Sequence, residues 1–164
     1  MRARDKIIKN IEVLAKICEK EKMSGKVVAF TNGCFDLLHI GHLRYLESAK
    51  ECGDILIVAI NSDLSVRRIK GYPRPIVGEE ERLELVAGFH CVDYVTCFDT
   101  VDPLPVIELL KPDVLVKGAD WPLEKIAGAS FVRSYGGRVV RVPLVNSRST
   151  TRLINHILSA YSSI

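Results

Sequence analysis

The chain has 164 residues, of which 48% are hydrophobic, which is enough for one apolar core and too little for two domains. Its formal net charge of +3 is too small to imply a nucleic-acid surface. No run of about 18 apolar residues occurs and the start has no signal-type stretch, so we expect a cytoplasmic protein without a membrane partner. Five cysteines without a Cys-x-x-Cys pair argue against a disulfide framework and a zinc knuckle.

The elements expected along the chain alternate between helices and strands. Apolar residues at helical spacing over 5–22 predict an amphipathic helix, so that residues 1–25 pack on a domain covering residues 26–164. Runs rich in Val and Ile then recur, separated by helix-length segments. The expected strands are 27–31, 54–61, 92–98, 113–117 and 138–142, and the expected helices are 40–52, 79–90, 103–111, 124–135 and 150–161. This order predicts the α/β class: a single Rossmann-like domain with a five-stranded parallel sheet and helices on both faces.

Several residues mark where these elements begin. Pro103 and Pro105 suit a helix start, and Ser149 or Thr150 is a candidate N-cap of the last helix. Residues 63–78 contain two glycines and two prolines, and we expect an irregular loop on the substrate side of the domain. A basic cluster within this stretch is either a solvated face or an anion site; its members are Arg67, Arg68, Lys70 and Arg74.

Polar segments, two of which contain glycine, follow four of the five predicted strands. In open parallel sheets, ligands bind beyond the carboxyl ends of the strands, where the winding direction reverses. The segments are 32–36 after the first strand, 61–63 after the second, 117–121 after the fourth and 146–151 after the fifth. We therefore expect one ligand site at this edge of the sheet.

The turn after the first strand carries two histidines three residues apart, His39 and His42, with Gly41 between them. Neither a P-loop nor a Gly-x-Gly-x-x-Gly fingerprint occurs, so phosphate must be held in another way. Gly33 allows close backbone approach, a helix starting near Ile40 directs its N–H groups at the turn, and the histidines add side-chain donors. Two alternatives remain open: ordinary histidines at a helix start, and a metal site formed with Asp36.

The string Gly33-x-Phe35-Asp36-x-x-His39-x-Gly41-His42, followed late in the chain by Ser149-Thr150-Thr151, resembles the cytidylyltransferase-like family of nucleotidylyltransferases. The resemblance covers about residues 10–160. Within the family, segments 31–36, 61–63, 68–71, 74–75, 114–118 and 148–151 are similar to the RfaE C-terminal domain branch, the adenylyltransferases of the ADP-heptose pathway. We expect the sugar-kinase domain fused to some relatives to be absent.

This resemblance implies that a sugar 1-phosphate, with heptose 1-phosphate expected, attacks the α-phosphorus of ATP, releasing pyrophosphate and forming an ADP-sugar for lipopolysaccharide or surface-glycan precursors. Such a reaction needs positioning and charge stabilisation but no general base. The residues implied in catalysis are His39, His42, Lys70 and Thr150. Mg²⁺ is expected to arrive on the triphosphate without protein ligands of its own. The resemblance also implies a homodimer.

The resemblance further assigns residues to the two substrates. Those expected at ATP are Asn32, Gly33, Cys34, Phe35, His39, His42, Lys117, Gly118, Asp120, Trp121, Arg148, Ser149, Thr150 and Thr151. Those expected at the sugar phosphate are Asp36, Asn61, Asp63, Lys70, Arg74 and Arg82.

Two of these assignments have alternatives. Trp121 is either next to the base or a core aromatic, and Arg82 either faces the phosphates or forms a surface pair with Glu79. A Gly-x-Asp-Trp pattern at residues 118–121 is similar to cytidylyltransferases that act on glycerol 3-phosphate, which makes such an activity the nearest rival. A third possibility is a nucleotide-binding module without catalytic activity.

Overall fold

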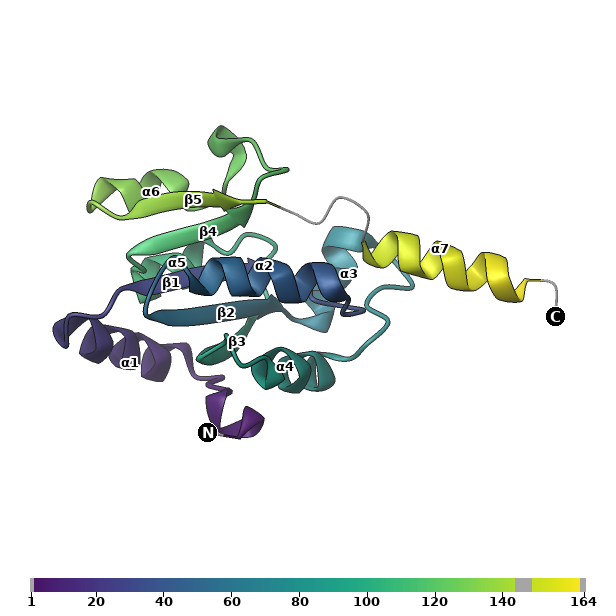
Figure 1. The fold of residues 1–164 in the computed structure, drawn as a ribbon, viewed down its shortest axis with the longest axis horizontal. Coiled ribbons are helices and arrows are strands. Elements are labelled where there is room, and N and C mark those ends of the chain that lie inside the picture. The colour runs from purple at the N-terminus through teal and green to yellow at the C-terminus, as the bar shows by residue number, and fades with distance from the viewer. Residues whose placement is uncertain (1, 144–148, 163–164) are drawn as a thin grey trace.

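A computed structural model describes residues 2–143 and 149–162. Its centre is a five-stranded, all-parallel sheet in the order β3-β2-β1-β4-β5 (Figure 1). The strands are β1 (Val28–Gly33), β2 (Ile55–Asn61), β3 (Tyr94–Phe98), β4 (Val114–Gly118) and β5 (Arg138–Val142). The chain winds outward from β1 to β3 and then returns to the other side of β1. The switch point therefore lies between β1 and β4, and the predicted fold class is confirmed.

Helices cover both faces of the sheet, which explains why β2 is buried along its whole length. Alternate residues of β2 face opposite cores: Leu56 and Val58 belong to one, Ile55 and Ile57 to the other. The first core includes α2 (Ile40–Lys50) and α4 (Glu79–Gly88), and the second includes α1 (Ile11–Met23), α5 (Leu104–Leu110) and α6 (Ala129–Ser134). Burying one such side chain contributes about 1.5–3 kcal/mol, so the sheet is a rigid support for the loops at its edge.

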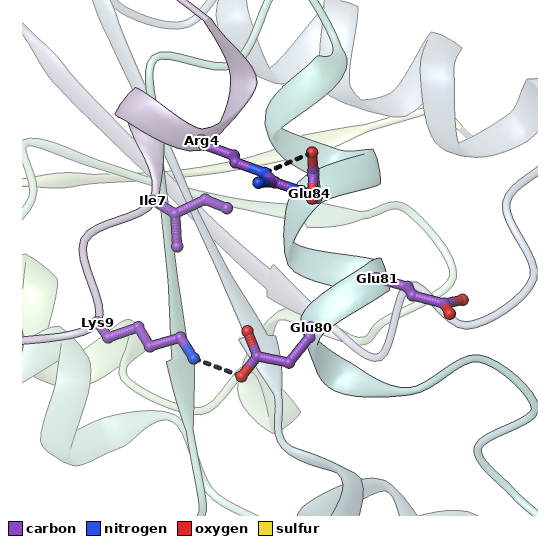
Figure 2. A pocket seen from close by; sticks show the side chains of 6 residues that line it. All are labelled: Arg4, Ile7, Lys9, Glu80, Glu81 and Glu84. Atoms are coloured by element: carbon purple, nitrogen blue, oxygen red, sulfur yellow. Dashed lines mark hydrogen bonds and ion pairs between the residues drawn. The ribbon is translucent and has the colours of Figure 1, made fainter.

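The N-terminal segment differs from the predicted helix over 5–22. Residues Ala3–Lys6 form the 3-10 helix η1, and α1 starts only at Ile11, because Asn10 caps it by accepting the N–H groups of Glu12 and Val13. Between them, Ile7 pairs with Val95 of β3. Figure 2 shows the ion pairs that join this segment to α4, Arg4 with Glu84 at 2.9 Å and Lys9 with Glu80.

The expectation of an irregular loop over residues 63–78 is wrong for the first half of this segment. Asp63–Lys70 form the helix α3, which Ser62 caps by accepting the Ser65 N–H, and Gly71 ends it at a φ of +76°. The basic residues Arg67, Arg68 and Lys70 occupy the last turn, where cations interact favourably with the helix dipole.

Two elements of the C-terminal third also bear on the site. The helix predicted over 124–135 is divided into η2 (Leu123–Lys125) and α6 at Gly128, whose φ is +82° and where a Cβ would lie 2.6 Å from Ile107. The last helix, α7 (Thr150–Tyr161), begins at the predicted N-cap Ser149. Among residues 2–143 and 149–162, no helix is long and apolar enough to cross a membrane.

Candidate active site

A cavity of about 700 Å³ opens at the carboxyl ends of the strands, beside the switch point. Most residues assigned from the sequence line it: Asn32, Gly33, Cys34, Phe35, Asp36, His39, His42, Asn61, Lys70, Arg74, Lys117, Gly118, Asp120, Trp121, Ser149, Thr150 and Thr151. Asp63 and Arg82 are not part of the lining, and Arg148 lies outside the described residues. The segments far apart in sequence thus meet at one edge of the sheet.

The sequence reasoning missed other lining residues. They are Gly41, Tyr45, Ile69, Val101, Asp102, Pro103, Lys125, Ile126 and Ala127. Three of them follow β3, whose carboxyl end lies at the same edge as those of the other strands. The parallel topology was the available signal, because it predicts that the loop after every strand reaches this edge.

The two histidines are fixed at the start of α2 by its own backbone. His39 is the N-cap, and its Nδ1 accepts the Gly41 N–H at 3.1 Å. The Nδ1 of His42 accepts the backbone N–H of His39 at 3.3 Å, and the two rings stack with centroids 4.0 Å apart. A neutral imidazole that accepts through Nδ1 carries its proton on Nε2. Both rings are therefore held as Nε2–H donors in the wall of the cavity.

His42 is a neutral donor at physiological pH. Burial and, to a smaller extent, the neighbouring His39 together lower the pKa of His42 to about 4. A neutral N–H can stabilise charge that develops on a phosphate without the desolvation that a buried cation requires. The described residues include no group of three His, Cys, Asp or Glu side chains that could hold a metal ion, so the alternative of a metal site with Asp36 is not supported.

The turn between β1 and α2 is tightly shaped around Phe35. A Cβ on Gly33 would lie 3.0 Å from the Phe35 ring, so only glycine fits there without displacing it. Phe35 itself has a φ of +46°, which non-glycine residues rarely adopt. Its ring is buried and lies 5.5 Å from the His42 ring, centroid to centroid. The strained residue thus packs directly against one of the two histidines.

Lys117 and Trp121 border the cavity on the β4 side. The ammonium group of Lys117 donates to Asn32 Oδ1, and burial lowers the pKa of Lys117 to about 8, although Asp102 and Asp120 act in the opposite direction. Trp121 is 52% exposed, so the alternative of a core aromatic is wrong. A cation near the end of β4 and an exposed indole in the segment that follows this strand are suited to a phosphate and a planar base, respectively.

The start of α7 also lines the cavity. Ser149 accepts the Arg152 N–H, and the Thr150 hydroxyl donates to the Leu37 carbonyl at 3.1 Å, which ties this helix to the turn before α2. As the first helical residues, Thr150 and Thr151 have backbone N–H groups without an intrahelical acceptor. Both residues line the cavity, so this helix start presents an anion-binding arrangement.

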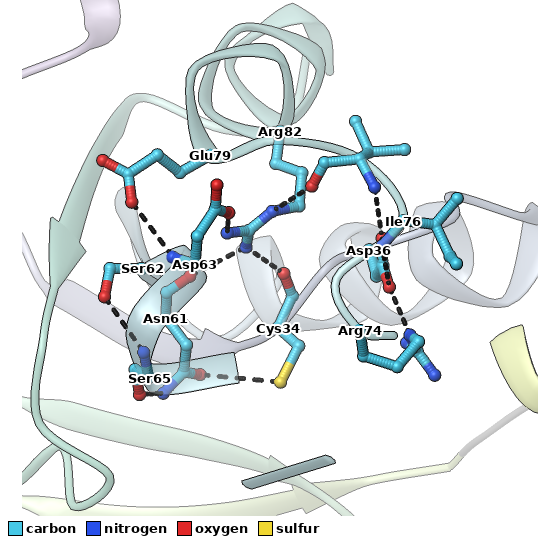
Figure 3. Close-up of polar contacts among 11 residues, drawn as sticks. Cys34, Asp36, Asn61, Ser62, Asp63, Ser65, Arg74, Ile76, Glu79 and Arg82 are labelled. Carbon is cyan, nitrogen blue, oxygen red and sulfur yellow. Dashed lines mark hydrogen bonds and ion pairs between the residues drawn. The ribbon is translucent and has the colours of Figure 1, made fainter. Parts of the chain in front are cut away.

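The carboxylate of Asp36 is bound to the protein itself. It is 2% exposed and accepts the N–H groups of Ile76 and Val77 as well as the Nε–H of Arg74 (Figure 3). Burial alone would raise the pKa of Asp36, but these donors lower it. Asp36 therefore anchors the 74–77 segment at the cavity wall, and Arg74 lines the cavity with its guanidinium paired.

Arg82 lies behind the wall of the cavity. Its guanidinium is completely buried, and it pairs with Asp63 at 2.7 Å. Glu79 instead accepts the Asp63 backbone N–H at 3.0 Å, so the alternative of a surface pair between Arg82 and Glu79 is wrong (Figure 3). Asn61, which does line the cavity, donates to Ser65 at 2.9 Å. The expectation that Arg82 and Asp63 face the sugar phosphate does not agree with this placement.

Comparison with known proteins shows which family has this arrangement. The sequence profile described as cytidylyltransferase-like matches residues 30–154. The chain belongs to the cytidylyltransferase-like family. The match extends from Phe30 in β1 to Ile154 in α7, so the family region includes both the histidine turn and the helix start that line the cavity.

Curated relatives of this family member share about half of its residues. The bifunctional protein HldE of Geobacter sulfurreducens is 53% identical over 157 residues, which is 96% of this chain and 32% of the relative. The protein of the same name from Geobacter metallireducens is 54% identical with the same coverage. The chain thus spans about a third of the length of the curated relatives it matches.

Solved structures agree with this family membership. The lipopolysaccharide core biosynthesis protein from Thermoplasma volcanium superimposes with a TM-score of 0.59 at 32% identity, covering 73% of this chain and 97% of that one. Pantoate-beta-alanine ligase from Francisella tularensis, at 16% identity, superimposes with a TM-score of 0.58 over 88% of this chain and 68% of its own, and shares the fold alone.

Proposed function

We propose that the protein transfers AMP from ATP to a sugar 1-phosphate, with heptose 1-phosphate as the acceptor, in cytoplasmic synthesis of lipopolysaccharide or surface-glycan precursors. The observation that carries this proposal is the pair of Nε2–H histidines that share one cavity of about 700 Å³ with the start of α7. The names of the relatives, HldE and a lipopolysaccharide core biosynthesis protein, support the choice of acceptor.

The reaction requires an in-line displacement at the α-phosphorus of ATP. An oxygen of the sugar phosphate forms the new bond to this phosphorus, and the bond to the bridging oxygen of the β-phosphate breaks, so that pyrophosphate leaves with the electron pair. His39 and His42 donate their Nε2–H groups to the oxygens on which charge develops. The nucleophile is already anionic, so no general base takes part, and catalysis consists of positioning and charge stabilisation.

The β- and γ-phosphates bind at the start of α7 in this proposal. The backbone N–H groups of Thr150 and Thr151 donate to them, while the Thr150 hydroxyl, by donating to Leu37, holds the helix start next to α2. Ser149 caps the helix, and Arg148 is assigned to the same phosphates. Mg²⁺ supplies further charge neutralisation; the described residues offer it no cluster of ligands, which is consistent with delivery on the triphosphate.

The base of ATP binds beside β4. Gly118 has no side chain and allows the base to approach the backbone, and Trp121 covers the ring of the base. Asp120 lines the same part of the cavity. Asn32 and Lys117, which are hydrogen bonded to each other, contact the nucleotide between its base and its phosphates. The backbone of residues 33–35 forms the floor under the α-phosphate.

The sugar phosphate binds on the β2 and β3 side of the cavity. Lys70 and Asn61 face it, and Arg74 contributes its charge from the pair with Asp36. Asp63 and Arg82 do not line the cavity, and they support this half of the site through the hydrogen bonds of Arg82 to Asp63 and to the Asn61 carbonyl. Neutralising Lys70 weakens binding of the sugar phosphate and leaves binding of adenosine unchanged, because only a phosphate contact is lost. The proposal includes a homodimer, which sedimentation tests.

A second candidate is cytidylyl transfer to an alcohol phosphate such as glycerol 3-phosphate, favoured by the exposed position of Trp121 at the cavity. A screen for pyrophosphate release, with ATP and CTP against phosphorylated sugars and polyols in the presence of Mg²⁺, separates the two. Release with ATP and a sugar 1-phosphate supports the proposal. Release only with CTP supports the second candidate, and no release with any pair supports a nucleotide-binding module without activity.

A further inference from the structure

Arg82 on α4 is completely buried, which is rare for an arginine, and it is not part of the cavity lining. A buried cation persists only where its donors are paired, so the acceptors around it show what it holds together. In the function proposed above, no contact between Arg82 and a substrate is available. Its contribution to the site must pass through the protein.

The guanidinium of Arg82 is hydrogen bonded to three segments of the chain: the turn at Cys34, residues 61–63, and Val77 (Figure 3). Its Nη1–H groups donate to the carbonyl oxygens of Cys34, at 2.6 Å, and of Asn61, at 2.8 Å. Its Nε–H donates to the Val77 carbonyl at 2.9 Å and its Nη2–H to Asp63 Oδ1 at 2.7 Å. The planar guanidinium supplies donors in several fixed directions at once, which a lysine ammonium on a flexible stem does not.

The Cys34 carbonyl is the most consequential of these acceptors. It belongs to the peptide that immediately precedes Phe35, the residue with the left-handed φ of +46°. Such a conformation persists only where the surroundings hold it. Arg82 holds the peptide before Phe35, and the bonds of Asp36 to Ile76 and Val77 hold the residue after it. The strained residue is thus fixed on both sides.

A continuous series of contacts leads from Phe35 to the histidines. The buried Phe35 ring lies 5.5 Å from the His42 ring, and the His42 ring stacks on His39 at 4.0 Å, centroid to centroid. If the Cys34–Phe35 peptide rotated, the Phe35 ring would leave this position and one side of His42 would lose its packing. The orientation of the His42 donor therefore depends on the Arg82 hydrogen bond.

We propose that Arg82 is a positioning residue that, through the Cys34 carbonyl and the Phe35 ring, holds the His42 imidazole in the orientation required for nucleotidyl transfer. For its kinetic effect this inference rests on the proposed function. A residue that only stabilises the fold affects stability but not kcat. A positioning residue affects kcat, although Arg82 itself touches no substrate.

The kinetic test uses Arg82→Met, Arg82→Lys and the control Leu83→Ala. Leu83 is the next residue of α4 and is completely buried in the same core as Phe35, but its side chain has no hydrogen-bonding group, so its truncation destabilises the domain without removing a hydrogen bond to the turn. Misplacement of a catalytic group by about 1 Å lowers rates roughly 100-fold, so we expect a loss of kcat of that order in Arg82→Met and a smaller loss in Arg82→Lys. KM for ATP stays within about threefold of the wild-type value if the effect is one of positioning rather than binding.

Two kinetic results would overturn the inference. If Leu83→Ala loses kcat as severely as Arg82→Met, or if Arg82→Met retains wild-type kcat, Arg82 has no positioning role. Should Arg82→Met fail to fold, Phe35→Leu interrupts the same series of contacts with Arg82 in place. That variant must lower kcat, and an unchanged kcat contradicts the inference.

A second readout needs no substrate and distinguishes failure of this inference from failure of the proposed function. In ¹⁵N NMR spectra of the ligand-free protein, wild-type His42 should show protonated Nε2 and unprotonated Nδ1. Arg82→Met or Phe35→Leu should give a mixture of both tautomers, whereas Leu83→Ala keeps the wild-type pattern. If the wild type releases no pyrophosphate, the proposed function fails while this test still decides the inference; an unchanged His42 pattern in both variants overturns it.

Discussion

Replacement of His42 by glutamine should remove a pH dependence from the stability of the protein. Burial and the adjacent His39 lower the pKa of His42 from 6.5 to about 4 in the folded protein. Between these two pH values the unfolded chain binds a proton that the folded protein does not, so the wild type loses stability as the pH falls from 6.5 to 4. The pKa difference corresponds to a loss of about 3 kcal/mol of wild-type stability at low pH. Glutamine does not titrate, so His42→Gln avoids this loss.

Urea unfolding of the two proteins at pH 7 and pH 4 measures this effect. The difference in free energy of unfolding between wild type and His42→Gln should shift by about 3 kcal/mol between the two pH values, in favour of the variant at pH 4. His156→Gln, at an exposed position on α7, is the control and should show no such shift. A shift below about 1 kcal/mol for His42→Gln would refute the account of a neutral, desolvated imidazole.

Three further predictions concern residues around the cavity. His39→Ala or His42→Ala should lower kcat by about 100-fold or more with a milder change in KM, measured by pyrophosphate release, because the donors meet charge that grows in the transition state; near-normal kcat in the double variant would contradict their role. Lys117→Met should stabilise the protein by about 3 kcal/mol more at pH 7 than at pH 10.5, because burial lowers the pKa of Lys117 to about 8 and its charged form is the unfavourable one; urea unfolding at both pH values checks this, and equal effects would count against it. Asp36→Asn should destabilise by about 3 kcal/mol in urea unfolding at pH 7, because Arg74 loses its buried partner; a change under about 1 kcal/mol would show that Asp36 does not anchor the 74–77 segment.

The fold could be predicted because its signals are local. Each buried strand reads as a short apolar run, and each helix between strands has room for its crossover, so the parallel sheet follows from the order of elements alone. The helix α3 was missed, although Ser62 is a suitable N-cap and the basic residues of its last turn suit a helix end. Because of the glycines and prolines that follow Lys70, the predicted loop was extended over residues 63–70, which form α3.

The cavity lining was predictable for the same topological reason, whereas the hydrogen-bond partners were not. Arg82 bonds to Cys34, 48 positions away, and Asp36 bonds to Ile76, 40 positions away. No periodicity or spacing in the sequence indicates such pairs, because they depend on how two loops lie against each other. The sequence therefore assigned Asp36 and Arg82 to the site, but it did not indicate that their side chains bind other parts of the protein.

The central claim is that the cavity selects ATP and a sugar 1-phosphate. Its most direct test is the ratio of kcat/KM for ATP to that for CTP with heptose 1-phosphate as the acceptor. Polar groups that pair with one base are left unpaired with the other, so the account predicts a preference for ATP of at least roughly tenfold, or about 1.4 kcal/mol. Faster turnover of CTP with glycerol 3-phosphate than of ATP with any sugar 1-phosphate would contradict the claim.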